Sequence, residues 1–216
     1  MLLCNSVISE SEIDQFKQNF SDNSNKKYVN FMAIDQVIDH RLTIPESSPL
    51  FDIISRIVAK DFSNPEKVWA AYQRQSLPHS IHIDDYASDE KDKYRYTYIL
   101  AMDSIPEFKA IIWKETCWDN NALNQFVSDW GKTKKFKKKI SNISTSEDLE
   151  HTFDENQQDY MADYLTLDGI YTYQCGTACL FNATQLHCTS NWLKYNKFPY
   201  RELLQIHVLN STPINC

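Results

Sequence analysis

Residues 94–102 read Tyr-Arg-Tyr-Thr-Tyr-Ile-Leu-Ala-Met, and aromatic residues alternate with other residues along the first half of this stretch. Because successive side chains of a β-strand point to opposite faces, the alternation predicts a half-buried strand. Other short segments are rich in β-branched or aromatic residues and are bounded by charged or proline-containing turns, so we expect them to be strands as well. These segments are residues 68–72, 80–84, 108–114, 169–174, 177–182 and 202–209.

Two amphipathic helices are predicted before most of these strands. Ser9 and Glu12 have the spacing of a capping box, and apolar residues then recur at helical intervals as far as Phe20. Residues 50–59 follow two prolines and carry isoleucines on one side, which predicts a second helix. Residues 28–34 are a further strand candidate.

A long segment, residues 116–168, interrupts the succession of strands. It holds a predicted helix at 122–130, and six lysines between Lys132 and Lys139 form either a solvated surface or a contact for an anionic ligand. We expect one domain over residues 1–216, with residues 1–66 as a preface of helices and strands and residues 116–168 as a lid-like insertion. The fold class predicted is mainly β with flanking helices, a sandwich or barrel rather than a doubly wound α/β sheet.

Composition excludes several functional classes. With only three glycines in 216 residues, the chain has no glycine-rich phosphate loop of the dinucleotide or P-loop kind. The formal net charge of −7 makes nucleic acid an improbable partner. No apolar run approaches the roughly 20 residues of a membrane span, and the start of the chain lacks the basic stretch of a secretory signal. We therefore expect no membrane partner, a cytoplasmic location and reduced cysteines.

Three residues form a candidate metal site. His82 and Asp84 are two residues apart at the end of a strand candidate, so their side chains would share a face, and His187 follows another strand candidate far downstream. Two histidines and one carboxylate are a ligand set that holds Fe(II) while leaving coordination positions open. Each of these residues alone could instead have a structural role, as part of a surface turn or of a packed core. A zinc site is the weaker alternative, because the spacing of its candidate ligands matches no zinc ribbon or zinc finger. Those candidates are Cys175, Cys179, His187 and Cys188.

Two segments around these residues resemble the Fe(II)/2-oxoglutarate-dependent dioxygenases. The first runs from Tyr72 through Pro-His-Ser-Ile-His-Ile-Asp-Asp at 78–85 to the strand at 94–102. The second is Cys-Gly-Thr-Ala-Cys-Leu-Phe-Asn-Ala-Thr-Gln-Leu-His at 175–187, followed by Arg201 at the start of the last predicted strand. The prolyl-hydroxylase-like and phytanoyl-CoA-hydroxylase-like branches are both compatible with this pattern.

The resemblance implies a fold, a site and a reaction. The fold would be a double-stranded β-helix, or jelly roll, and His82, Asp84 and His187 would be the catalytic metal ligands. Arg201 would hold the distal carboxylate of 2-oxoglutarate, with Tyr72 or Tyr96 assisting; Lys194 is the competing basic residue. With Fe(II), 2-oxoglutarate and O₂ as cofactor and co-substrates, the enzyme would hydroxylate an unidentified small-molecule or peptide substrate and release succinate and CO₂.

Two rival functions use the same architecture. The first is a cupin-like metal protein that works without 2-oxoglutarate, and the second is a non-catalytic jelly-roll module that binds a ligand or partner. Arg201 separates the first rival from the oxygenase, because only the oxygenase needs a cation for 2-oxoglutarate. Metal binding separates the second.

Overall fold

In the computed structural model, the chain is described over residues 1–4, 7–23, 40–76, 79, 82–84, 94–116, 165–190 and 199–209. These residues form two helices and nine strands. The elements are β1 (Leu2–Cys4), α1 (Glu10–Asn23), β2 (His40–Thr43), α2 (Pro49–Val58), β3 (Lys67–Gln75), β4 (Tyr94–Ala101), β5 (Ile105–Thr116), β6 (Leu167–Tyr173), β7 (Ala178–Asn182), β8 (Gln185–Thr189) and β9 (Arg201–Leu209). The predicted strand at 28–34, the predicted helix at 122–130, the lysine run and Lys194 lie outside the described residues.

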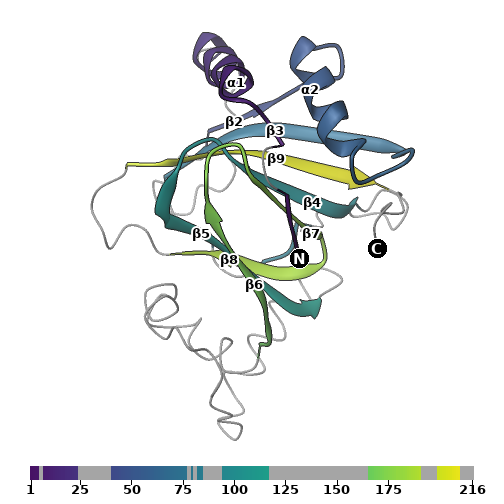
Figure 1. Ribbon diagram of the computed structural model, residues 1–216, viewed down its shortest axis with the longest axis vertical. Coiled ribbons are helices and arrows are strands. Elements are labelled where there is room, and N and C mark those ends of the chain that lie inside the picture. Colours follow the sequence, from purple (N-terminus) through teal and green to yellow (C-terminus); the bar gives the residue numbers. More distant parts are fainter. Residues whose placement is uncertain are drawn as a thin grey trace, which may run out of the picture.

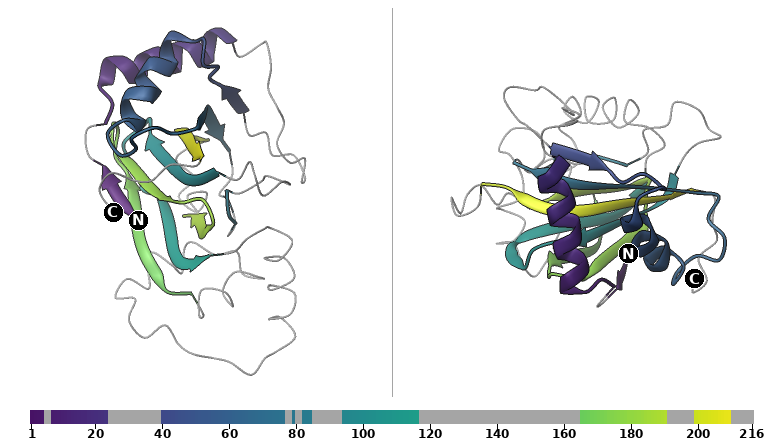
Figure 2. Two further views of the ribbon diagram at one scale, coloured as in Figure 1. Left: turned by 90° about the vertical axis from the view of Figure 1, so that its right-hand side faces the viewer. Right: turned by 90° about the horizontal axis from the view of Figure 1, so that it is seen from above.

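The strands form two antiparallel sheets. The larger has the order β1-β7-β4-β9-β3-β2, and the smaller has the order β6-β5-β8. Figure 1 shows the two sheets facing each other, with both helices on the outer side of the larger one. Seen from above, α1 crosses the strands beneath it (Figure 2, right). The predicted mainly β fold with flanking helices is therefore confirmed.

Local sequence signals explain both helices. The Ser9 backbone N–H donates to the Glu12 carboxylate at 2.9 Å, which is half of the predicted capping box, and the Glu12 N–H approaches Ser9 Oγ at 3.4 Å. Ser48 caps α2 by accepting from the Leu50 N–H at 3.3 Å, and Pro49 occupies the first turn, where its missing N–H costs nothing. Both helices thus begin where their N-cap serines lie.

Side-chain alternation divides the interior into two cores. On β3, β4 and β9 the even-numbered side chains, such as Tyr72, Tyr98 and Ile206, pack under the helices with Phe16. Odd-numbered side chains of the same strands face the smaller sheet, where Ile99 and Leu203 pack with residues of β5 and β6. The larger sheet is therefore buried on both faces, and the space between the sheets is where odd-numbered side chains meet.

Three strands and one segment differ from the sequence expectations. No sequence pattern predicted β1 and β2, which are the two edge strands of the larger sheet, or β8, which carries His187. The predicted strand at 80–84 is replaced, in its described residues 82–84, by one isolated β-bridge between His82 and His187. Within the described part of the chain, no helix has the length and apolarity needed to cross a bilayer.

Candidate metal centre

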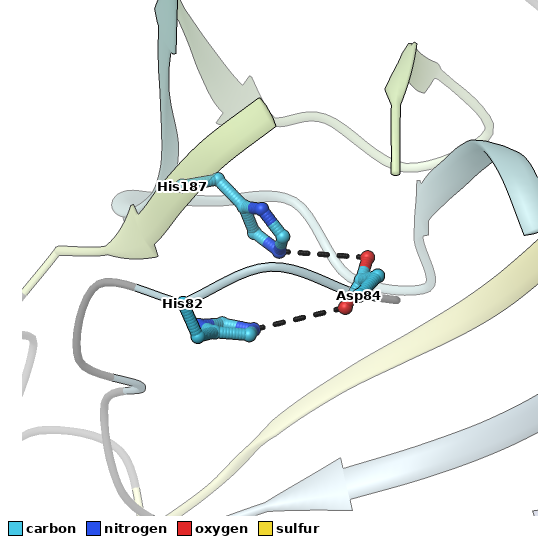
Figure 3. Close-up of side chains that lie close together, drawn as sticks. All are labelled: His82, Asp84 and His187. Carbon is cyan, nitrogen blue, oxygen red and sulfur yellow. Dashed lines mark ion pairs between the residues drawn. The ribbon is translucent and has the colours of Figure 1, made fainter. Parts of the chain in front are cut away.

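The backbone brings His82, Asp84 and His187 together. His82 and His187 exchange two backbone hydrogen bonds, at 2.9 and 3.0 Å, and the Asp84 N–H donates to the Ala183 carbonyl at 3.0 Å. Segment 82–84 is therefore held against β8 and against the turn that joins β7 to β8. Figure 3 shows the result, with both imidazoles directed at the Asp84 carboxylate.

The three side chains have the spacing of a metal site. His187 Nε2 lies 3.4 Å from Asp84 Oδ2, and His82 Nε2 lies 3.7 Å from Oδ1. All three potential ligand atoms lie within 4.8 Å of one another, and no other such group of His, Cys, Asp or Glu side chains occurs among the residues that the structure describes. The cysteines of the zinc alternative therefore do not join His187 in a cluster.

A backbone carbonyl selects the tautomer of His187. Nδ1 of this ring lies 2.9 Å from the Gln185 carbonyl oxygen, which can only accept, so Nδ1 carries the proton. In the neutral ring, the lone pair of Nε2 then points at Asp84. An outer hydrogen bond of this kind is how proteins orient a metal-binding imidazole.

The Asp84 carboxylate fits a cation. Burial acts to raise its pKa, but His187 first, then His207 and His82, outweigh burial and hold the pKa below its usual range. Oδ2 is buried and has no hydrogen-bond partner. When Nε2 of His187 carries no proton, this buried carboxylate oxygen faces a lone pair, and two acceptors so placed need a proton or a metal ion between them.

A cavity between the sheets connects this triad to Arg201. Arg201 begins β9, is 2% exposed, and donates from Nε to Gln75 Oε1 at 2.5 Å and from Nη1 to the Tyr173 hydroxyl at 2.8 Å. The described residues that line the cavity are Arg41, Gln73, Gln75, His79, His82, Asp84, Ile99, His187, Cys188, Thr189, Arg201, Leu203 and Gln205. The cavity therefore holds the triad and a buried cation together.

Tyr72 and Tyr96 do not reach this cavity. Tyr72 packs against Phe20 of α1 with ring centroids 4.8 Å apart, and Tyr96 packs against Phe62 at 5.0 Å. Both tyrosines lie at even-numbered positions, and strand alternation turns them toward the helices. The expectation that they assist Arg201 is corrected: Tyr173, from β6 of the opposite sheet, contacts its guanidinium instead.

Sequence reasoning missed several polar residues of the cavity. Gln73 and Gln75 lie on one face of β3 and Tyr72 on the other, as strand alternation predicts. The sequence does not say which of the two faces lines the cavity, and in the structure it is the face of the glutamines. Gln205 lies on the same face of β9 as Arg201. Arg41 comes from β2, which no sequence pattern indicated.

Comparisons with known proteins agree on the fold. No family model and no curated protein sequence matches this chain. Among solved structures, the epimerase SnoN from nogalamycin biosynthesis, described as non-haem and α-ketoglutarate-dependent, is 9% identical, with a TM-score of 0.60 over 98% of this chain and 79% of its own. HygX from Streptomyces hygroscopicus, solved with nickel and 2-oxoglutarate, is 14% identical, with a TM-score of 0.54 over 96% and 81%.

A third neighbour is the viral collagen prolyl hydroxylase vCPH from Paramecium bursaria Chlorella virus-1, in a 2-oxoglutarate complex. It is 8% identical, with a TM-score of 0.50 over 96% of this chain and 93% of its own. The fold is that of the Fe(II)/2-oxoglutarate-dependent oxygenases. The jelly-roll prediction is thereby confirmed, and the similarity at these identities concerns the fold alone.

Proposed function

We propose that this protein is a non-haem Fe(II)- and 2-oxoglutarate-dependent oxygenase that hydroxylates its substrate and releases succinate and CO₂. The observation that carries the proposal is the shared cavity, in which the triad of His82, Asp84 and His187 and the buried Arg201 line one space. HygX, which shares the fold and was solved once with nickel and 2-oxoglutarate and once with iron, supports it.

The triad would hold Fe(II) through Nε2 of each histidine and one Asp84 oxygen. His187 is prepared for this by its Nδ1–H bond to Gln185, and Asp84 offers a buried oxygen with no hydrogen-bond partner. Three protein ligands leave positions free for a co-substrate and O₂. When bound, iron would activate O₂ with 2-oxoglutarate as the reductant: one oxygen atom would convert 2-oxoglutarate to succinate and CO₂, and the other would pass to the substrate.

Arg201 would bind the distal carboxylate of 2-oxoglutarate. Its planar guanidinium matches a carboxylate, and the bonds to Gln75 and Tyr173 fix the plane before the co-substrate arrives. At 2% exposure the Arg201 guanidinium is largely withdrawn from water, so an anionic ligand would compensate for the solvation that burial has removed. This cation favours the oxygenase over a cupin-like metal protein, which has no need of it.

Equilibrium dialysis with Mn(II) and radiolabelled 2-oxoglutarate tests this assignment. We expect wild-type protein to bind both, and Arg201→Gln to keep Mn(II) while its 2-oxoglutarate affinity falls about tenfold or more, as expected for losing a charge-assisted hydrogen bond. Arg56→Gln is the matched control, since Arg56 pairs with Glu12 on the helix layer. Equal 2-oxoglutarate binding by Arg201→Gln and wild type would contradict the proposal.

Hydroxylation needs a test of its own, because solved structures of this fold include an epimerase and a carbocyclase. The readout is the mass of the product, which gains one oxygen atom from ¹⁸O₂ if the substrate is hydroxylated. An oxidised product without the label would identify another outcome of the same oxidant. We further propose that the enzyme works in the cytoplasm, where the four described cysteines, all free, would stay reduced.

A further inference from the structure

A second arginine lines the same cavity from an edge strand of the larger sheet. Arg41 lies on the edge strand β2, where its backbone is paired with Gln73 of β3. Its side chain extends over β3 on the cavity face of the sheet and donates from Nη2 to Gln205 Oε1 on β9 at 2.9 Å, and its guanidinium carbon lies 5.2 Å from the centre of the Trp69 ring. Neither the proposed metal binding nor the proposed 2-oxoglutarate binding uses the Arg41 guanidinium.

Trp69, beneath Arg41, is itself held by neighbouring side chains. Trp69 packs against His207 with ring centroids 5.2 Å apart, and His207 Nδ1 shares a hydrogen bond of 3.0 Å with Thr97 Oγ1. Burial lowers the pKa of His207 to about 4; Asp84 acts in the opposite direction, and Arg41 adds to the lowering. His207 is therefore uncharged at neutral pH and leaves the positive charge of this corner on Arg41.

Neutral amides separate the two arginines. Gln75 donates to Gln73 at 2.7 Å, Gln73 contacts Gln205, and the ends of this row receive hydrogen bonds from Arg201 and Arg41. The row holds the two guanidinium groups at fixed places on the cavity floor. An amide floor also offers hydrogen bonds to a polar ligand lying between them.

The charges of the described lining residues leave an excess. These residues include two arginines and one carboxylate, that of Asp84. Fe(II) and the dianion 2-oxoglutarate bring equal and opposite charges, and Asp84 balances only one arginine. Counting only the arginines and carboxylates of the described lining, one positive charge therefore remains when Fe(II) and 2-oxoglutarate are bound, and it favours a substrate that brings a negative group.

We propose that Arg41, held over Trp69, binds an acid group of the substrate, a carboxylate or a phosphate, so that the enzyme acts on a small anionic molecule. This inference rests on the proposed function, because it treats the cavity as the place of reaction. A guanidinium forms paired, charge-assisted hydrogen bonds with either acid group. The Trp69 ring attracts the Arg41 guanidinium through a cation–π contact.

The test uses protein loaded with Zn(II) and 2-oxoglutarate, so that Arg201 is occupied and no turnover occurs. Three probes are titrated by ligand-observed NMR: benzoate, phenyl phosphate and benzamide, the neutral shape match of benzoate. We expect at least one acid to bind about tenfold more tightly than benzamide, the effect of one charge-assisted interaction. Which acid is preferred identifies the group that the site recognises.

Three variants locate that preference. Arg41→Gln should bring the acids within about threefold of benzamide, Arg41→Lys should keep part of the preference, and Arg56→Gln should keep all of it. The inference is overturned if benzamide binds as well as both acids, if no probe binds, or if the preference persists in Arg41→Gln. Far-ultraviolet circular dichroism checks that each variant is folded.

A second arm separates this inference from the proposed function. If wild-type protein fails to take up Zn(II) and 2-oxoglutarate, the proposed function fails. The same titration is then run on metal-free Arg201→Gln protein, where Arg41 is the remaining guanidinium of the described lining. A preference for acids that disappears in the Arg41→Gln, Arg201→Gln double variant would uphold an acid site at Arg41, and its absence would overturn that site as well.

Discussion

Tyr173→Phe removes one hydroxyl from the cavity and leaves the ring. Tyr173 is 2% exposed, its hydroxyl accepts from Arg201 Nη1 at 2.8 Å, and its ring packs edge-on against Phe108 with centroids 6.3 Å apart. Burial raises the pKa of this phenol, so it is protonated at neutral pH and the lost bond is one between a cation and a neutral oxygen. Such bonds contribute about 1.5–3 kcal/mol.

Two measurements should respond to this loss. Urea denaturation should show a free energy of unfolding lower by about 2 kcal/mol, because Arg201 stays buried with one partner fewer. Dialysis with Mn(II) should show 2-oxoglutarate affinity about tenfold lower and Mn(II) affinity unchanged, since the variant loosens the guanidinium and touches no metal ligand.

Tyr171→Phe is the matched control. Tyr171 lies two residues earlier on the same face of β6, and its buried hydroxyl donates to the Thr177 carbonyl at 2.7 Å and accepts from the Ala101 N–H at 3.2 Å. Its loss should lower stability by a similar amount while 2-oxoglutarate affinity stays within about twofold. The reasoning is refuted if both variants weaken 2-oxoglutarate equally, or if Tyr173→Phe changes neither stability nor affinity.

Three further predictions concern the metal, the helix layer and pH. Asp84→Ala should abolish binding of Mn(II) in dialysis; retained binding would disprove the ligand assignment. Phe16→Ala, at a fully buried position of α1, should cost about 3–5 kcal/mol in urea denaturation and leave Mn(II) affinity unchanged, because α1 covers the other face of the sheet. His207 has a pKa of about 4 when folded and about 6.5 when unfolded, so the unfolded chain binds the extra proton between these values. Stability should therefore fall by up to about 3 kcal/mol from pH 6.5 to pH 4, and urea denaturation of His207→Asn should show this contribution missing; an unchanged pH dependence would count against it.

Local signals predicted much of this structure. The Ser9–Glu12 spacing predicted the start of α1, and the alternation in 94–102 predicted β4. The triad was proposed from residue types and order, and the structure brings those side chains within ligand distance of one another. The helix and strand predictions needed only residues that are close in sequence, and the triad needed only the residue types that are known to bind a metal ion.

What the sequence did not reveal depends on pairing between distant strands. Tyr72 and Gln73 are adjacent and face opposite sides of the sheet, so a change of one position decides which of them lines the cavity. Because α1 covers the even-numbered face, Tyr72 packs under the helix and Gln73 faces the cavity. Arg41 reaches Gln205 only because β2 pairs with β3 and β3 with β9. Tyr173 approaches Arg201 from the other sheet. No local pattern encodes such contacts.

The most direct test of the central claim is an anaerobic titration of the metal-free protein with Fe(II), followed by 2-oxoglutarate. The account predicts a visible metal-to-ligand charge-transfer band that appears only when both have been added and is lost in His187→Ala. Iron binding without the band on addition of 2-oxoglutarate would contradict the oxygenase and favour the cupin-like rival. Failure to bind iron at all would contradict the metal site itself.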